Sequence, residues 1–165
     1  QGQDLLDQEP RLLILRTFSK ALGAAGLRLG YLLGEPGVLA KIRERIGPYP
    51  LNWWQVLGVP RAWARRLELP GRLERLRAER EVLRLGLERL GCRVLPSQAN
   101  FLLFRVPGRS TGTSLAGALA RAGVRVRSFG DVGVLAPWLR VTVGRPEENR
   151  FFLEALGRVL PGGPA

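Results

Sequence analysis

The sequence predicts an α/β fold in which a strand–loop–strand unit and helices precede an α+β unit. Short runs rich in Val, Leu and Phe, bounded by Gly and Pro, are typical of strands. Apolar residues at helical spacing between these runs predict amphipathic helices. With 45% hydrophobic residues among 165, the chain has the composition of a globular protein.

The first elements come from the N-terminal part of the chain. Residues 11–16 (RLLILR) are almost continuously apolar and predict a strand buried on both faces. Residues 17–26 are small and turn-permissive, which predicts a loop before a second buried strand at 27–34. Residues 35–47 carry Pro36 near the first turn and end on Gly47, which predicts a helix.

The middle of the chain is predicted to be helical. The helical pattern is weak over 53–67, and we expect Pro70 and Gly71 to interrupt it. A long helix then spans 71–90 and stops at Gly91. Its apolar face comprises Leu73, Leu76, Leu83, Leu87 and Leu90.

The last part of the chain predicts an α+β unit. Four short runs, CRVLP, NFLLFRV, GVRVRSFG and WLRVTVG, predict strands. A helix at 113–123 is opened by Thr113 or Ser114 and closed by Gly123. An amphipathic helix at 145–160 follows, with Pro and two Glu in its first turn. The PGGPA tail is expected to be disordered.

Composition limits the function classes. The net charge of +12 suggests a nucleic-acid partner, but the arginines occupy amphipathic stretches and are not interleaved with aromatic residues. We therefore expect solvated helix faces and no specific nucleic-acid partner. No apolar run approaches the roughly 20 residues that span a bilayer, so no membrane partner is expected. Cys92 is the only cysteine, which fits a reducing, cytoplasmic location.

Lys20 is the strongest candidate for chemistry, since only it and Lys41 are lysines among 26 basic residues. An amine can lose its proton and form a Schiff base, which a guanidinium cannot do. Thr17, Ser19 and Arg28 could supply phosphate donors around it. On spacing alone, an incidental lysine in a small-residue turn remains an equal alternative. We assign no metal-binding residues.

The segment RTFSKALGAAGLRLGY resembles the cofactor-lysine segment of fold-type I, pyridoxal-phosphate-dependent aminotransferases. Within them it is most similar to the histidinol-phosphate aminotransferase branch. The resemblance implies that Lys20 is catalytic and bonds to the cofactor aldehyde. It also implies that Thr17, Ser19 and Arg28 hold the phosphate of pyridoxal 5'-phosphate.

Downstream segments extend the resemblance to substrate binding. LPSQANFLLFRV resembles the stretch that enters the small-domain sheet, where Asn100 fits the family pattern. A turn asparagine before a strand explains Asn100 equally well. The resemblance implies that Arg140, within WLRVTVG, takes the substrate α-carboxylate, and that Arg127 contacts a substrate phosphate. The neighbouring arginines that could replace Arg127 in this role are Arg125 and Arg145.

The resemblance also implies the domain organisation. Residues 1–70 would be the C-terminal part of the large cofactor domain, and residues 71–165 the small domain with a short, mainly antiparallel sheet. The family's acidic partner for the pyridine nitrogen is not found, because Asp4 and Asp7 lie in the wrong context. We therefore expect the C-terminal half of a longer enzyme, inactive by itself.

The activity implied is transamination between histidinol phosphate and 2-oxoglutarate in histidine biosynthesis, by a cytoplasmic homodimer acting on small molecules. Three alternatives stay open. The first is another reaction on the same scaffold, such as threonine-phosphate decarboxylation or aromatic transamination. The second is an inactive, truncated fragment, and the third is a basic module that binds nucleic acid.

Overall fold

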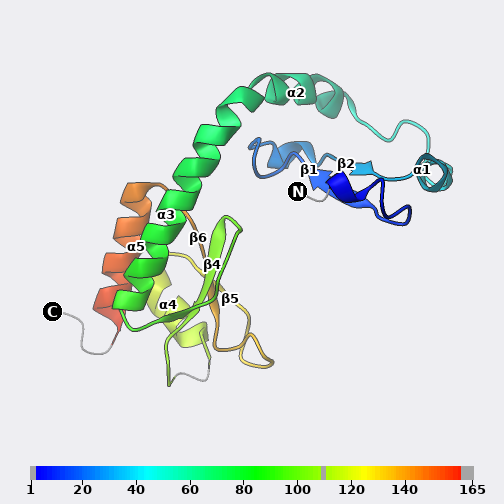
Figure 1. Ribbon diagram of the computed structural model, residues 1–165. Helices are drawn as coiled ribbons and strands as arrows, with labels where there is room; N and C mark the ends of the chain where they lie inside the picture. The colour runs from blue at the N-terminus through cyan, green and yellow to red at the C-terminus, as the bar shows by residue number, and fades with distance from the viewer. Residues whose placement is uncertain (1–2, 109–110, 161–165) are drawn as a thin grey trace. The chain divides into compact units, whose positions relative to one another are not determined.

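The computed structural model describes residues 3–108 and 111–160, and the chain divides into two compact units, Gln1–Leu73 and Glu74–Ala165. The first unit contains η1 (Gln3–Leu5), β1 (Ile14–Thr17), η2 (Ala25–Leu27), β2 (Gly30–Leu33), α1 (Pro36–Arg43), α2 (Trp53–Ala64) and η3 (Arg66–Glu68). Helix α3 (Leu69–Arg89) begins in this unit and continues into the second (Figure 1). The tail 161–165, expected to be disordered, lies outside the described residues.

Strands β1 and β2 form an antiparallel ribbon whose register pairs Ile14 with Leu33 and Thr17 with Gly30. Both strands were predicted, but their predicted burial is wrong. Leu15 is 77% exposed, and every residue of β1 after Ile14 is exposed. The described residues provide β1 with one neighbouring strand, β2, so its apolar side chains keep contact with solvent.

The helices of the first unit are capped by local side chains. The Glu35 carboxylate accepts hydrogen bonds from the backbone N–H groups of Gly37 and Val38, which fixes the start of α1. At the start of α2, Asn52 and Gln55 cap each other reciprocally, with the Asn52 side chain accepting from the Gln55 N–H. The helices predicted over 35–47 and 53–67 are confirmed, but both end earlier than predicted, at Arg43 and Ala64.

Helix α3 does not break at Pro70 and Gly71, so that expectation is wrong. Pro70 lies in the first turn of α3, where the missing N–H would have no partner in the helix anyway. The predicted end at Gly91 is confirmed. Gly91 has φ of +75°, and the N–H of Cys92 donates to the Leu87 carbonyl at 3.0 Å, as in a Schellman motif.

The second unit is an α+β layer pair. Strands β3 (Arg93–Val94), β4 (Phe101–Arg105), β5 (Arg127–Ser128) and β6 (Leu139–Thr142) form a sheet ordered β3-β4-β6-β5, with antiparallel neighbours. Helices α4 (Thr113–Arg121) and α5 (Pro146–Val159) complete the unit. The four predicted strands and the antiparallel sheet are confirmed. The predicted N-cap of α4 is wrong, because Gly112 occupies that position and Thr113 is already helical.

The core of this unit lies between the helices and one face of the sheet (Figure 1). Leu102 and Phe104 alternate with Phe101 and Leu103 along β4, and only the first two are fully buried. The Phe104 and Phe152 rings meet edge to face at 5.8 Å between centroids. The other core members are Leu83, Leu87, Cys92, Leu115, Leu119, Leu139, Val141, Val143, Ala155 and Leu156.

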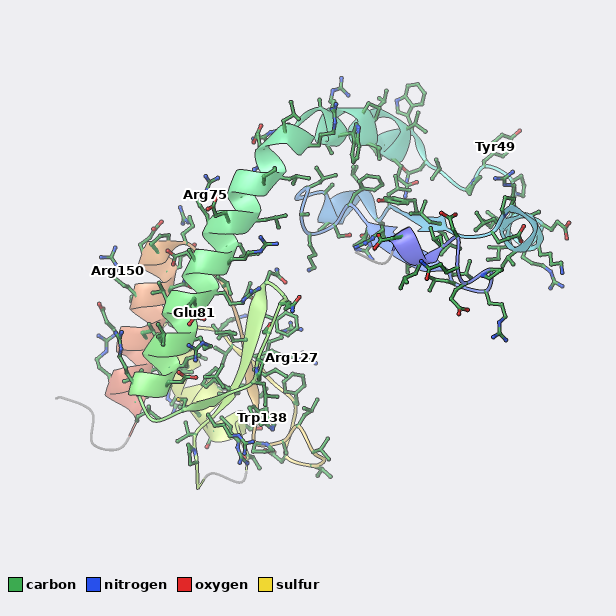
Figure 2. The ribbon with its side chains drawn as sticks, viewed as in Figure 1. Tyr49, Arg75, Glu81, Arg127, Trp138 and Arg150 are labelled. Atoms are coloured by element: carbon green, nitrogen blue, oxygen red, sulfur yellow. The ribbon has the colours of Figure 1, made fainter. Side chains whose placement is uncertain are left out.

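Many arginines occupy helix surfaces, as the sequence predicts. Arg75 on α3 and Arg150 on α5 project outward (Figure 2). On α3, Arg84 pairs with Glu81 and Glu88 one turn away on either side. Within residues 3–108 and 111–160, no helix combines the length and apolar character needed to cross a membrane.

Candidate active site: the lysine loop and the arginine pair

The predicted cofactor residues lie on one loop of the first unit, residues 17–28, here called the lysine loop. Backbone hydrogen bonds close it at its base, where the Phe18 N–H donates to the Leu29 carbonyl at 3.2 Å. Across the loop, the Ala24 N–H donates to the Phe18 carbonyl at 3.2 Å. Lys20 lies at the turn, and its carbonyl accepts from the Gly23 N–H at 3.0 Å. The Lys20 side chain is exposed.

Two hydroxyls adjoin each other at the start of the lysine loop. The Thr17 hydroxyl lies 2.9 Å from the Ser19 hydroxyl and 3.3 Å from the Leu29 carbonyl oxygen. The Ser19 backbone N–H donates to Thr17 Oγ1 at 3.1 Å, so the two side chains are held together. This contact lies within one turn. The two hydroxyls belong to residues three and one positions before Lys20, so both are close in sequence to its amine.

Arg28 ends the lysine loop in an unusual backbone conformation. Its φ and ψ are +50° and +46°, the left-handed region, which costs a non-glycine residue about 1–2 kcal/mol. Its guanidinium is exposed, and Nη1 donates to the Ala25 carbonyl at 3.3 Å. Such strain persists where surrounding contacts fix it, and it concentrates at binding sites.

The residue that contacts the backbone of Arg28 from α2 was not among the predicted site residues. Gln55, only 9% exposed, donates from Nε2 to the Leu27 carbonyl at 2.9 Å and to the Arg28 carbonyl at 3.3 Å. The spacing of Asn52 and Gln55 is that of a capping box, a signal visible in the sequence. No signal in the sequence indicates the contact with Arg28, which lies 27 residues away.

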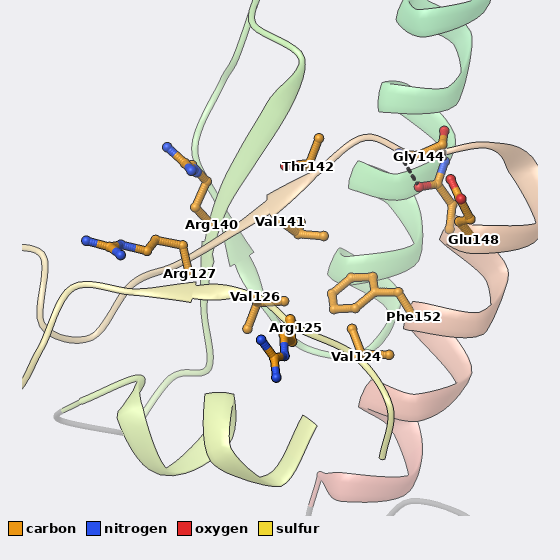
Figure 3. A pocket seen from close by; sticks show the side chains of 11 residues that line it. Val124, Arg125, Val126, Arg127, Arg140, Val141, Thr142, Gly144, Glu148 and Phe152 are labelled. Atoms are coloured by element: carbon orange, nitrogen blue, oxygen red, sulfur yellow. Dashed lines mark hydrogen bonds between the residues drawn. The ribbon is translucent and has the colours of Figure 1, made fainter. Parts of the chain in front are cut away.

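The predicted substrate arginines lie together in the second unit. Arg127 on β5 and Arg140 on β6 are register partners, and we call them the arginine pair. Both are exposed, and they project from the sheet side by side, away from Phe152 and the core (Figure 3). Opposed residues of an antiparallel ladder lie about 5 Å apart at their Cα atoms, so two guanidiniums can reach one ligand.

The charges of the arginine pair are not neutralised by the described residues. Neither guanidinium forms an ion pair within residues 3–108 and 111–160. Arg140 lies over the Phe101 ring, with 5.2 Å from its guanidinium carbon to the ring centroid. Glu148 is already engaged, since hydrogen bonds from the Arg145 side chain and backbone hold the pKa of its carboxyl below the usual range.

A cleft of about 470 Å³ adjoins the arginine pair. It opens where β5 and β6 diverge at the first turn of α5 (Figure 3). Its lining includes Arg127, Arg140, Thr142, Asn149 and Phe152. The two guanidiniums project away from Phe152, which lines the cleft, so a carboxylate or phosphate would meet them on the open face of the sheet and not inside the cleft (Figure 3).

Asn100 lies in the turn before β4, apart from the lysine loop in sequence and in a different unit. Its carbonyl accepts from the Val143 N–H at 2.9 Å, which extends the pairing of β4 with β6. The turn is anchored by Arg80, whose guanidinium donates to the Ala99 carbonyl at 2.9 Å. This contact uses only the main chain of Asn100, so the role of its side chain in substrate binding stays a prediction.

The donor set of the lysine loop matches a phosphate ester with an aldehyde. It offers hydroxyls, one guanidinium and one primary amine, and residues 17–28 contain no carboxylate to compete. These groups therefore fit pyridoxal phosphate. Among the described residues, no cluster of His, Cys, Asp or Glu could hold a metal ion.

The chain is similar in sequence to known aminotransferases. The chain is 40% identical over 157 residues to histidinol-phosphate aminotransferase 1 of Carboxydothermus hydrogenoformans, covering 95% of this chain and 44% of that protein. It is 41% identical over 159 residues to histidinol-phosphate aminotransferase of Frankia casuarinae, covering 96% of this chain and 38% of that protein. The chain thus spans less than half the length of the curated relatives it matches.

Solved structures of related enzymes share the fold of this chain. Histidinol-phosphate aminotransferase of Sinorhizobium meliloti, in complex with pyridoxal-5'-phosphate, matches with a TM-score of 0.73 and 25% identity, covering 92% of this chain and 42% of that chain. The Clostridium acetobutylicum histidinol-phosphate aminotransferase matches with a TM-score of 0.82 and 23% identity, covering 93% and 47%. L-threonine-O-3-phosphate decarboxylase of Porphyromonas gingivalis matches with a TM-score of 0.81 and 22% identity, covering 93% of this chain and 48% of that chain. The last two likenesses establish the fold alone.

The family model described as aminotransferase class I and II matches residues 2–156, which is nearly the whole chain. The match includes both the lysine loop and the arginine pair. The chain therefore belongs to the class I and II aminotransferase family.

Proposed function

We propose that this chain forms the lysine-bearing part of a longer, pyridoxal-phosphate-dependent aminotransferase that acts on histidinol phosphate and 2-oxoglutarate. The observation that carries the proposal is the lysine loop, in which Lys20 is flanked by two joined hydroxyls and a strained arginine. The names of the relatives support the substrate assignment. Cytoplasmic location and a homodimer remain predictions from the resemblance.

Each residue of the lysine loop has a distinct part in the proposal. Thr17, Ser19 and Arg28 bind the cofactor phosphate, the hydroxyls as neutral donors and the guanidinium as a charged fork. Lys20 holds the cofactor through Nζ, and when released it accepts the proton from the substrate α-carbon at that same atom. When bound, pyridoxal phosphate supplies an electron sink for the charge left on that carbon.

In this proposal the arginine pair binds the substrate. Arg140 takes the carboxylate of the amino-acid or 2-oxo acid substrate, and Arg127 takes the phosphate of histidinol phosphate. Asn100 is kept as a further substrate contact. The domain division proposed from the resemblance assigns the lysine loop to the cofactor domain (1–70) and the arginine pair to the small domain (71–165).

A second candidate is decarboxylation of threonine phosphate. That substrate carries both a phosphate and a carboxylate, so two adjacent arginines suit it equally well. In the complete enzyme, conversion of histidinol phosphate that depends on 2-oxoglutarate supports our proposal. Release of carbon dioxide from threonine phosphate without a 2-oxo acid supports the second candidate.

The lysine assignment can be tested on this chain. The chain is mixed with pyridoxal phosphate, reduced with borohydride, and mapped by peptide mass spectrometry. We expect the reduced label on Lys20, and Lys20→Ala should remove it. Lys41, the other lysine and also exposed, is the internal control. Labelling mainly at Lys41 would overturn the assignment.

A further inference from the structure

We propose that Gln55 is a positioning residue for phosphate binding, because its buried amide holds Arg28 in the left-handed conformation that aims the guanidinium. The inference rests on the proposed function, in which Arg28 binds the cofactor phosphate. Gln55 itself does not touch the phosphate in this proposal. It acts through the backbone of the lysine loop.

The hydrogen bonds of Gln55 are fully committed. Its Oε1 accepts from the Asn52 N–H at 2.8 Å, which fixes the orientation of the side-chain amide. Both hydrogens of Nε2 are then left for the Leu27 and Arg28 carbonyls. These carbonyls belong to the peptide groups on either side of the Arg28 nitrogen and Cα, so their positions set φ and ψ of Arg28.

The packing of α2 supports the same inference. Gly58 lies one turn after Gln55, on the same face of α2. A Cβ on Gly58 would lie only 2.8 Å from Leu27 Cδ2, so the helix approaches the lysine loop closely at this point. Gln55 and Leu27 thus join α2 to the loop by a polar and an apolar contact. A residue in this contact can shift Arg28 without being part of the phosphate site.

Two substitutions separate the amide donor from the rest of the side chain. Gln55→Glu keeps an oxygen for the Asn52 N–H but replaces the donor with a second oxygen that faces two carbonyls. Gln55→Met has a similar length and volume, lacks the donor and adds no charge. Asn52→Ala is the matched control, because it removes the cap of α2 from the other side and leaves Nε2 of Gln55 intact.

The readout compares borohydride trapping at Lys20 by pyridoxal phosphate and by pyridoxal, which lacks the phosphate. The preference at each lysine is the yield of trapping by pyridoxal phosphate divided by the yield with pyridoxal. The preference at Lys20 is then divided by the preference at Lys41. This ratio measures specific phosphate binding, because the general attraction of a basic chain for phosphate acts on both lysines. We expect both Gln55 variants to lower this ratio about tenfold, the value of one charged hydrogen bond. Asn52→Ala should leave it unchanged.

The outcomes distinguish the two proposals. If the unsubstituted chain shows no preference at Lys20, the phosphate site itself is wrong, and both proposals fall. If that preference exists and Gln55→Met retains it, the role of Gln55 alone is overturned. A loss in Gln55→Glu only would be an effect of the added charge and also overturns it.

A second measurement covers the case in which a Gln55 variant fails to fold. Arg28→Gly removes the strain, because glycine enters the left-handed region freely. We therefore expect Gln55→Met to destabilise the first unit less in the Arg28→Gly background than in the unsubstituted chain. Equal destabilisation in the two backgrounds would contradict the positioning role.

Discussion

Arg127 and Arg140 are register partners of the β5–β6 ladder, and both project from the face of the sheet opposite the core. Two like charges held side by side repel each other unless an anion lies between them. The described residues supply no carboxylate to either guanidinium. We therefore predict that the pair binds a ligand with negative charge.

The first prediction concerns the phosphate preference of this pair. Arg127→Ala should weaken binding of histidinol phosphate about tenfold, since one charge-assisted contact is lost. Binding is measured in an NMR titration through the side-chain Nε–Hε signal of Arg140, which the unsubstituted chain and both variants share. Arg125→Ala is the control, because it removes the same charge two residues earlier, outside the ladder. Equal weakening by both variants would remove the assignment of Arg127.

The second prediction concerns the base of the lysine loop. A Cβ on Gly30 would lie 2.3 Å from the backbone oxygen of Arg16, which cannot move without breaking the β1–β2 pairing. Gly30→Ala should therefore destabilise the first unit by about 1–3 kcal/mol. The loss of stability is measured as faster hydrogen exchange of the Phe18 amide, which donates to the Leu29 carbonyl at the base of the loop. Gly26→Ala, where nothing lies within 4 Å of the added Cβ, should change stability by less than about 0.5 kcal/mol.

The sequence predicts elements whose signals are local. Gly91 and Pro146 mark the end of α3 and the start of α5 correctly, because caps depend on a few neighbouring residues. Pro70 was misjudged, since proline ends one helix and begins another with equal ease. Burial of β1 was misjudged for another reason. An apolar run shows what a strand can bury, whereas its exposure depends on which other strands are present.

The same division holds for the candidate site. Thr17, Ser19, Lys20 and Arg28 could be identified together because one short segment carries all four. Gln55 could not, because its contact with Arg28 depends on how α2 packs on the loop. The pairing of Arg127 with Arg140 depends on the strand register. The alternation of apolar residues predicts which face of the sheet a side chain lies on, but not which residue of the neighbouring strand lies opposite it.

The third prediction concerns the buried amide behind the cleft. Asn149, 3% exposed, donates to Glu79 at 2.8 Å, and exchanges hydrogen bonds with the N–H and carbonyl of Gly144. Asn149→Ala leaves these groups without partners and should cost about 2–3 kcal/mol in urea unfolding. Glu79→Gln keeps an acceptor for Asn149 and should cost less than about 1 kcal/mol. Similar costs for the two variants would argue against this network.

The last prediction concerns Cys92, which is 6% exposed in the core of the second unit. Burial raises the pKa of its thiol from 9.0 to about 11, because the thiolate loses its hydration there. Between these values the folded protein keeps the proton that the unfolded chain releases. The thiol therefore contributes stability below about pH 9, and this contribution is lost as the pH rises through about 11.

The test compares the unfolding free energy of the chain and of Cys92→Ala from pH 8 to 11. The substitution leaves a small cavity, which lowers stability by a constant amount at every pH. Other titrating groups are common to both chains, so the difference between the two curves isolates the thiol. We expect this difference to shrink steadily above pH 9, and we expect the native thiol to react slowly with a disulfide reagent at pH 8. Parallel curves together with rapid reaction at pH 8 would mean that Cys92 is open to water, and that the α3 C-terminus, which it follows, is less closely packed than the structure has it.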